Sequence, residues 1–363
     1  MPRETFYGHV YRVNTAADRL RAKLRMRLGL ARPPTLLPYR GFGTPQRALI
    51  RGRVLEDRDL TFDEGSTWRR VAVAVRRYAT FEIVAEPVCF TWNGRTYEGR
   101  SDTEGYVDLW VEPPPDAIVG ENRVLGHLPR SPERVTEASV FIAPADAAYG
   151  VISDIDDTVI ETGATNLLRR AHALFWAQAK HRIPFEGVAA FYRALRAGPT
   201  GFGSNPIFYL SSSPWNLHAH LVELLDMHEL PRGPLLLRDW GFGPEGFAPT
   251  GKHEHKVKKA EELLLTFPDL PFVLVGDSGQ EDAKHYGTIV ERHPDRIVAV
   301  FLRDVDHPRT RFDGWVERIR SFGVPVVVAK TSLQAAQRAC ELRLVHDETV
   351  DAVQRQRRRD LTV

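Results

Sequence analysis

The chain has 363 residues, 43% of them hydrophobic, and this length exceeds what one hydrophobic core usually serves, so two domains are expected. Its two cysteines, Cys89 and Cys340, stand far apart in no paired spacing, which argues against a disulfide framework or a thiolate zinc site and favours a reducing cytoplasm. No apolar run approaches the roughly 18 residues that cross a bilayer, and the N-terminus lacks the apolar core of a signal peptide, so a soluble or peripheral protein is expected.

Charge is unevenly distributed along the chain. The net charge is only +2, but residues 1–53 carry twelve Lys and Arg against two acids, which gives +10 there and about −8 for the remainder. Residues 1–34 are expected to form a basic amphipathic helix at 15–28 and a linker, because Arg32-Pro33-Pro34 breaks the helix. The leucine stripe of this helix can pack on the protein itself or lie peripherally on an anionic membrane, whereas nucleic-acid binding is the least favoured interpretation and is not expected. The stripe consists of Leu20, Leu24 and Leu28.

Residues 35–145 show the alternation and turn spacing of an all-β domain. Asn93-Gly94 separates two such stretches and predicts a type I′ hairpin, and residues 102–105 predict another turn. Short strands at a spacing of about 8–12 residues indicate a β-sandwich. The predicted strands are 47–55, 70–75, 80–84, 88–92, 95–101, 106–112, 124–128 and 138–143.

The pattern changes near Pro144, after which apolar runs alternate with helical stretches. Continuous apolar runs are typical of parallel strands covered on both faces, so residues 146–345 predict a Rossmann-like, doubly wound α/β domain. Residues 346–363 predict a basic C-terminal tail. The predicted strands are 151–155, 206–210, 234–237, 271–275, 297–301 and, more weakly, 324–328, and the predicted helices include 218–225 and 256–265.

Polar clusters follow three of these strands. Ligands bind beyond the carboxyl ends of the strands in an open parallel sheet, so the clusters should converge on one edge. The alternative is that the aspartates merely cap the next turns, but capping explains neither a lysine near position 256 nor a second acidic cluster. The clusters are Asp154, Asp156 and Thr158 after the first strand, Ser211 and Ser212 after the second, and Asp277 and Asp282 after the fourth.

The order of these clusters resembles the four motifs of the haloacid-dehalogenase superfamily. The resemblance implies that Asp154 attacks phosphorus to give an aspartyl-phosphate, and that Asp156 protonates the leaving alcohol and then activates water. It also implies a Mg²⁺ ion held by Asp154, the backbone carbonyl of Asp156 and Asp277, with Asp282 orienting the metal's waters; hard oxygen ligands suit this ion. The residues expected to contact the substrate phosphate are Thr158, Ser211, Ser212 and Lys256.

The third motif of the superfamily is a lysine, and the sequence offers several close together. Lys256 is preferred because it stands at the start of an apolar-periodic helix ahead of the fourth strand. Lys252 and Lys258 remain alternatives.

The strings around the motifs, at 150–160, 209–216, 237–241 and 275–282, resemble a narrower family, the phosphatidate phosphatase catalytic domains typified by the actin-patch-associated enzyme of yeast. That resemblance implies Mg²⁺-dependent hydrolysis of phosphatidate to diacylglycerol and phosphate, and therefore a phospholipid substrate. Two alternatives stay open: a phosphatase for a soluble phosphomonoester such as a phosphosugar, and a non-catalytic adaptor. The partner of the β-sandwich and the oligomeric state are also open.

Overall fold

The computed structural model describes residues 33–56, 83–155, 185–238, 252–278, 281–304 and 310–362. These residues divide into two compact units, an N-terminal unit that ends at Ile142 and a C-terminal unit that begins at Ala143. No described helix is long and apolar enough to cross a membrane. Several predicted features lie outside the described residues: the basic helix at 15–28, the strand at 70–75, Asp156 and Thr158.

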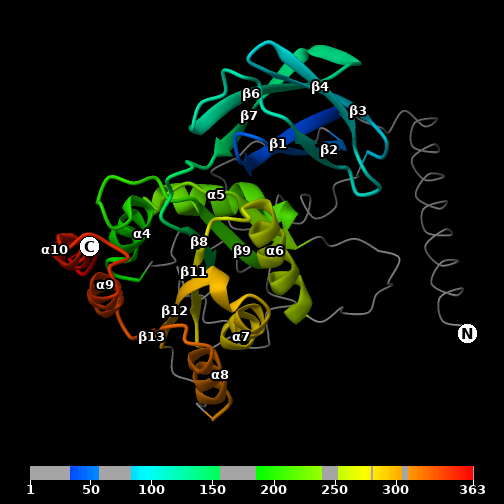
Figure 1. Ribbon diagram of the computed structural model, residues 1–363. Helices are drawn as coiled ribbons and strands as arrows, with labels where there is room; N and C mark the ends of the chain where they lie inside the picture. The colour runs from blue at the N-terminus through cyan, green and yellow to red at the C-terminus, as the bar shows by residue number, and fades with distance from the viewer. Residues whose placement is uncertain are drawn as a thin grey trace, which may run out of the picture. The chain divides into compact units, whose positions relative to one another are not determined.

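The N-terminal unit is built on one seven-stranded sheet with the order β4-β3-β6-β7-β1-β2-β5 (Figure 1). Neighbouring strands run antiparallel, except for β1 and β7, which are parallel. The strands are β1 (Pro34–Gly43), β2 (Ala48–Glu56), β3 (Pro87–Trp92), β4 (Arg95–Arg100), β5 (Tyr106–Val111), β6 (Gly120–Leu128) and β7 (Ser131–Ile142).

The β-rich character predicted for this region is confirmed, but the expected sandwich needs correction, because the described strands form one sheet and not two. This sheet curls until its edge strands approach each other: the Tyr97 hydroxyl on β4 donates a hydrogen bond of 2.8 Å to the carbonyl oxygen of Glu112, just after β5. Strands from the whole sheet therefore share one core, in which Ile50, Phe90 and Val140 are fully buried. A curled sheet and a sandwich give the same alternating sequence, since in both cases each strand turns one face inward.

The sequence does not predict β1, because Pro34 and Pro38 argue against a strand with neighbours on both sides. In the structure, the first part of β1 pairs only with β2, and its pairing with β7 begins at Gly41. Pro34 and Pro38 therefore lie in the part of β1 that, among the described strands, has a neighbour on one side only. The predicted hairpin is confirmed, since Asn93 and Gly94 have φ values of 46° and 80°, as a type I′ turn requires.

The C-terminal unit contains a six-stranded sheet with the order β10-β9-β8-β11-β12-β13, in which all neighbours run parallel. All six strands predicted for this region are confirmed. Every residue of β8 and of β11 is buried, which explains why both read as unbroken apolar runs. The strands are β8 (Gly150–Asp154), β9 (Ile207–Pro214), β10 (Leu235–Arg238), β11 (Phe272–Asp277), β12 (Ile297–Arg303) and β13 (Val326–Ala329).

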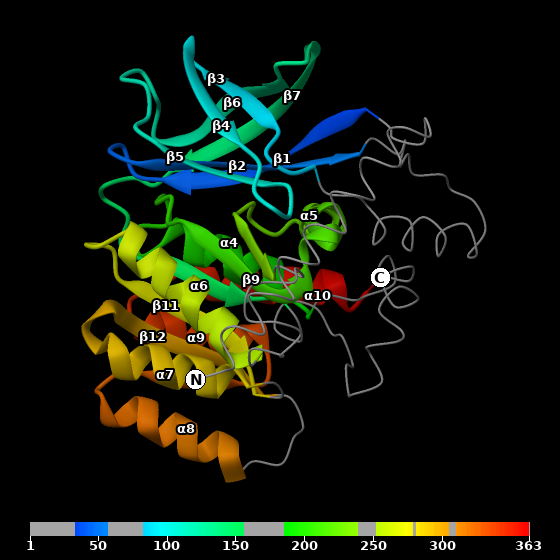
Figure 2. The same ribbon diagram turned by 90° about the vertical axis from the view of Figure 1, so that its right-hand side faces the viewer.

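Helices cover both faces of this parallel sheet. Helices α6, α7 and α8 pack side by side on one face, and α4, α9 and α10 on the other (Figures 1 and 2). Most of the segment predicted as a basic tail forms α10. The helices are α4 (Val188–Ala197), α5 (His218–Met227), α6 (Lys252–Thr266), α7 (Asp282–Arg292), α8 (Thr310–Ser321), α9 (Ser332–Glu341) and α10 (Thr349–Asp360), with short 3₁₀ turns at Trp215–Leu217 and Pro294–Arg296.

The strand order places a switch point at the centre of the sheet. The first three strands are added toward one edge and the last three toward the other, so β8 and β11 lie side by side. In doubly wound sheets of this order, ligands bind beyond the carboxyl ends of the two strands at the switch point. Those ends are Asp154 and Asp277.

Candidate active site

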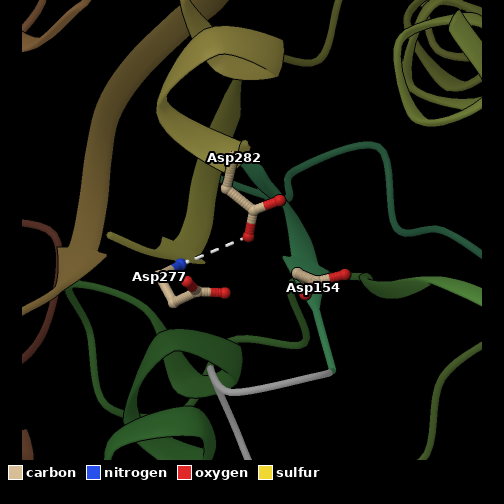
Figure 3. Close-up of side chains that lie close together, drawn as sticks. All are labelled: Asp154, Asp277 and Asp282. Carbon is tan, nitrogen blue, oxygen red and sulfur yellow. Dashed lines mark hydrogen bonds between the residues drawn. The ribbon is translucent and has the colours of Figure 1, made fainter. Parts of the chain in front are cut away.

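Three aspartates meet at the switch point (Figure 3). Asp154 ends β8, Asp277 ends β11 and Asp282 begins α7. Each of the three is 0% exposed. One carboxylate oxygen of each lies within 4.8 Å of the others. We call these three residues the acidic cluster, and it brings together two of the polar clusters that the sequence places after separate strands.

A glycine allows the chain to return Asp282 to the strand end. A Cβ atom on Gly276 would lie 2.8 Å from Oδ2 of Asp282 and 2.6 Å from the ring of Tyr286, closer than such atoms approach. With no side chain there, Oδ2 of Asp282 accepts a hydrogen bond of 3.2 Å from the backbone N–H of Asp277 (Figure 3). The first turn of α7 is therefore held against the end of β11.

Lys256 is the lysine that reaches the acidic cluster. Its Nζ lies 2.8 Å from Oδ1 of Asp154 and 2.7 Å from Oδ1 of Asp282, and the residue is 3% exposed. Lys258, one of the alternatives, is exposed on the same helix. The side chain of Lys252 lies outside the described part of the chain. Among the described side chains, the geometry selects Lys256.

Burial and charge act in opposite directions on these groups. Burial would lower the pKa of the Lys256 ammonium, but the charges of Asp154 and Asp282 outweigh it and hold that pKa above its ordinary value. Burial would likewise raise the pKa of Asp282, but the Lys256 charge, helped by His285, lowers it to about 2. Lys256 and Asp282 therefore form a charged pair at neutral pH.

Three buried carboxyl groups face one ammonium, so the acidic cluster, when fully ionised, would carry more negative charge than Lys256 can balance. Ionised carboxylates that are buried this close together are costly unless a cation compensates them. The buried oxygen atoms also lie close enough together to share one ion, so this cluster could hold a metal ion.

The predicted serines lie at the same edge of the sheet. Leu210 on β9 pairs in register with Asp154, so Ser211 follows immediately beyond the level of the acidic cluster. Ser211 is fully buried, and Ser212 is half-buried. The backbone N–H of Ser213 donates a hydrogen bond of 3.0 Å to Oγ of Ser211, which fixes the turn of the chain at this point.

Two buried hydroxyl groups, which the sequence does not predict as part of the site, lead by hydrogen bonds to the backbone carbonyl of Asp154. Oγ of Ser153 donates a hydrogen bond of 2.7 Å to the carbonyl oxygen of Asp154 and lies 2.6 Å from the hydroxyl of Tyr192 on α4. Burial raises the pKa of Tyr192, so its phenol stays protonated and can donate to Ser153. The only sequence signal is a serine inside an otherwise apolar strand, and nothing in the sequence connects it to Tyr192.

Two more residues with basic side chains flank the acidic cluster, His285 and Arg303. His285, one turn along α7, has its Nδ1 atom 3.5 Å from Oδ1 of Asp282. Arg303 ends β12, pairs in register with Asp277, and places its guanidinium over the ring of Phe185. Neither residue was identified from the sequence. Arg303 could have been found among the residues that follow the fifth predicted strand, whereas the only sequence signal for His285 is its helical spacing from Asp282.

The fold and the cluster first define a class: a doubly wound α/β domain with a buried, metal-competent acidic site at its switch point. Residues 149–304 of this domain match the family model described as "Phosphatidate phosphatase APP1, catalytic domain". This match confirms the resemblance inferred from the motif strings.

Two curated relatives match the chain over longer segments. Phosphatidate phosphatase APP1 of Saccharomyces cerevisiae is 26% identical over 212 residues, which cover 58% of this chain and 35% of the relative. An uncharacterized protein of Schizosaccharomyces pombe is 26% identical over 181 residues, covering 48% of this chain and 28% of the relative. The chain thus spans about a third of the length of these relatives. A solved carbohydrate acetylesterase from Xanthomonas citri aligns over 79% of this chain and 74% of its own, but with a TM-score of 0.26 and 11% identity, which supports no inference.

Proposed function

We propose that the C-terminal unit is a Mg²⁺-dependent phosphomonoester hydrolase of the haloacid-dehalogenase type, and that phosphatidate is its substrate. One observation carries the proposal: Lys256 bridges Asp154 and Asp282 at the switch point beside Asp277, within a segment that matches a phosphatase catalytic-domain family. A capping role for the aspartates accounts for neither the buried lysine nor the convergence of three carboxylates.

In the proposed reaction, a carboxylate oxygen of Asp154 attacks phosphorus in line with the ester oxygen. The bond from phosphorus to that oxygen breaks, and the leaving alkoxide takes a proton from Asp156, which lies outside the described residues. Water then attacks the aspartyl-phosphate and gives its proton to Asp156. The bond from phosphorus to Asp154 breaks, which releases phosphate and restores the carboxylate.

The other residues position the phosphoryl group. Lys256, already paired with the nucleophile, neutralises charge on the phosphoryl oxygens, and Ser211 donates a hydrogen bond to one of them. Thr158 and Ser212 are expected to make further contacts with the phosphate.

The acidic cluster fits the proposed metal, because buried hard oxygen donors from three carboxylates suit Mg²⁺. Asp154 and Asp277 would bind the ion directly, together with the backbone carbonyl of Asp156, and Asp282 would orient its waters. When bound, Mg²⁺ would offset the negative charge of the carboxylates and the phosphoryl group.

The proposal is tested with the variant Asp154→Asn and with a choice of substrates. Phosphate release should depend on Mg²⁺ and disappear in Asp154→Asn, while its circular dichroism shows that the fold is retained, since Lys256 keeps Asp282 as a partner. Full activity in that variant would rule out the nucleophile. Phosphatidate in mixed micelles should be hydrolysed faster than a panel of soluble phosphomonoesters; turnover of the soluble esters alone would eliminate phosphatidate.

A further inference from the structure

The last turns of α10 present a basic surface. Arg355, Arg358 and Arg359 are exposed and spaced three and four residues apart, so they lie on one face of the helix. None of the three forms an ion pair within the ranges that the structure describes. Leu361, directly after the helix, is 63% exposed. We call these four residues the basic end of α10.

Helix α4 fixes where this basic end lies. A carboxylate oxygen of Asp360 accepts a hydrogen bond of 2.7 Å from the backbone N–H of Gly187, which immediately precedes α4. Helix α4 lies between the parallel strands β8 and β9 along the chain, so it runs opposite to the strands and begins at their carboxyl edge. The end of α10 therefore lies at the edge that carries the acidic cluster, and Figure 2 shows the C-terminus on that side of the sheet.

A second contact gives the same placement. Phe185, two residues before Gly187, lies under the guanidinium of Arg303, and Arg303 is the last residue of β12. Because Arg303 is paired with Asp277 across the sheet, the chain that leads into α4 lies at the carboxyl ends of the strands. The basic end of α10 is thus tied to the active-site edge of the C-terminal unit.

We propose that the basic end of α10 docks the C-terminal unit on an anionic phospholipid bilayer, with the active-site edge turned toward the lipid headgroups. The choice of a lipid as partner rests on the proposed function. Each arginine close to an anionic membrane strengthens binding by about fivefold, so the three together give about a hundredfold. The exposed Leu361 adds an apolar group of the kind that enters the boundary between headgroups and acyl chains.

Arginines in a last helical turn also stabilise the negative end of the helix dipole, so their position alone does not require a partner. A purely helix-stabilising role predicts a lower unfolding midpoint when they are removed and no change in lipid binding. Docking predicts the reverse. Vesicle binding therefore separates the two roles.

The test compares two charge-matched triple variants of the full chain. The test variant removes the charges of the basic end. The control removes the same charge from exposed arginines in the last turns of α8 and α9, which run away from the active-site edge. The test variant is Arg355→Gln, Arg358→Gln and Arg359→Gln, and the control is Arg318→Gln, Arg320→Gln and Arg338→Gln.

Binding is measured by co-sedimentation with vesicles of phosphatidylcholine and about one-third phosphatidylglycerol, an anionic lipid that is not a phosphomonoester. The test variant should bind about a hundredfold more weakly than wild type, and the control should bind within about threefold of it. Equal losses in both variants would mean that only overall charge matters and would overturn the proposal, as would unchanged binding of the test variant. Loss of binding to a DNA duplex with vesicle binding retained would overturn it in favour of nucleic acid.

Activity assays separate this proposal from the proposed function. Hydrolysis of p-nitrophenyl phosphate should be the same in the test variant and in wild type, while hydrolysis of phosphatidate in these vesicles should fall in parallel with binding. If wild type hydrolyses no phosphatidate, the substrate assignment fails, but the vesicle-binding comparison still decides the docking surface. Normal phosphatidate hydrolysis by a test variant that no longer binds vesicles would refute docking as the route to substrate.

Discussion

Replacing Lys256 by methionine should destabilise the C-terminal unit and reverse the pH dependence of its stability. The substitution keeps the length and helix propensity of the side chain but removes the charge that lies 2.8 Å from Asp154 and 2.7 Å from Asp282. Against the effect of burial, Lys256 with help from His285 lowers the pKa of Asp282 from 3.8 to about 2, so at about 1.4 kcal/mol per unit this group contributes about 2 kcal/mol that depends chiefly on the Lys256 charge. Loss of one partner of a buried ion pair costs about 3–5 kcal/mol, so we expect the free energy of unfolding to fall by about 3 kcal/mol at pH 7.

The sign of the pH dependence follows from the direction of the pKa shift. In wild type, the pKa of Asp282 is lower in the folded than in the unfolded state, so its contribution is complete above about pH 4 and is lost as the pH falls toward 2. In Lys256→Met, burial, the largest influence on this group, is opposed by His285 but no longer by Lys256, so the pKa of Asp282 should rise. Lowering the pH from 7 toward 4 should therefore stabilise the variant and bring it closer to wild type.

Urea unfolding followed by tryptophan fluorescence, with a metal chelator at several pH values, measures this effect. The matched control is Lys258→Met, which removes an exposed charge from the same helix and should change the free energy of unfolding by less than about 0.5 kcal/mol. Adding Mg²⁺ should restore part of the stability of Lys256→Met, because a bound cation compensates the same carboxylates. Equal unfolding of Lys256→Met and Lys258→Met, or acid destabilisation of Lys256→Met like that of wild type, would contradict the stabilising role of the Lys256 charge.

Tyr192→Phe removes only the hydroxyl that supports the end of β8 at Asp154, the proposed nucleophile, so kcat should fall several-fold with KM unchanged. Tyr209→Phe, in the ring stacked on Tyr192, loses a buried hydrogen bond of 2.8 Å to the carbonyl oxygen of Pro231 and should lose about 1 kcal/mol of stability but keep its kcat. Equal kinetics in the two variants would rule out the positioning role. Burial, and to a smaller extent nearby positive charges, lowers the pKa of His255 to about 4. The free energy of unfolding should therefore decrease by up to about 3 kcal/mol as the pH falls from 6.5 to 4. In thermal unfolding, His255→Gln should flatten the dependence of stability on pH over this range. An unchanged profile would contradict the assignment. Gly276→Ala forces a Cβ atom to within 2.8 Å of the Asp282 carboxylate and should abolish activity and the Mg²⁺ binding measured by calorimetry. The control is Gly314→Ala, where a Cβ atom meets nothing within 4 Å, and it should be neutral or stabilise the protein by about 1 kcal/mol. An active Gly276→Ala enzyme would show that the close approach of Asp282 to Gly276 is not needed.

The parallel sheet could be predicted because its residues are buried on both faces. Strands such as β8 and β11 are then apolar throughout, and only their last residues are polar, which marks the edge where the site lies. The positions of Asp154, Asp277 and Ser211 at one edge follow from this rule alone. The sequence favoured Lys256 by its position but left Lys252 and Lys258 as alternatives, and the burial that separates Lys256 from Lys258 is seen only in the structure.

Contacts between segments that are distant along the chain could not be predicted from the sequence. The hydrogen bond between Ser153 and Tyr192 joins a strand to a helix that no local pattern links, and both groups are ordinary residues in a buried layer. Similarly, alternation in the N-terminal unit gives the face of each strand but not whether the strands form one sheet or two. The curl of the sheet brings Tyr97 into contact with the opposite edge, and sequence spacing does not predict this contact.

The central position of β8 has a consequence for biosynthesis. Its two neighbours are β9, which follows soon after it, and β11, which is made much later, so Asp154 and Asp282 are separated by more than a third of the chain. At typical translation rates of about 5–20 residues per second, the ribosome needs on the order of ten seconds to deliver the second half of the acidic cluster. During that interval β8 exposes an apolar edge that can pair wrongly or recruit a chaperone. Nascent chains released before α7 emerges should therefore contain none of the activity, and the catalytic centre should appear in a single late step of synthesis.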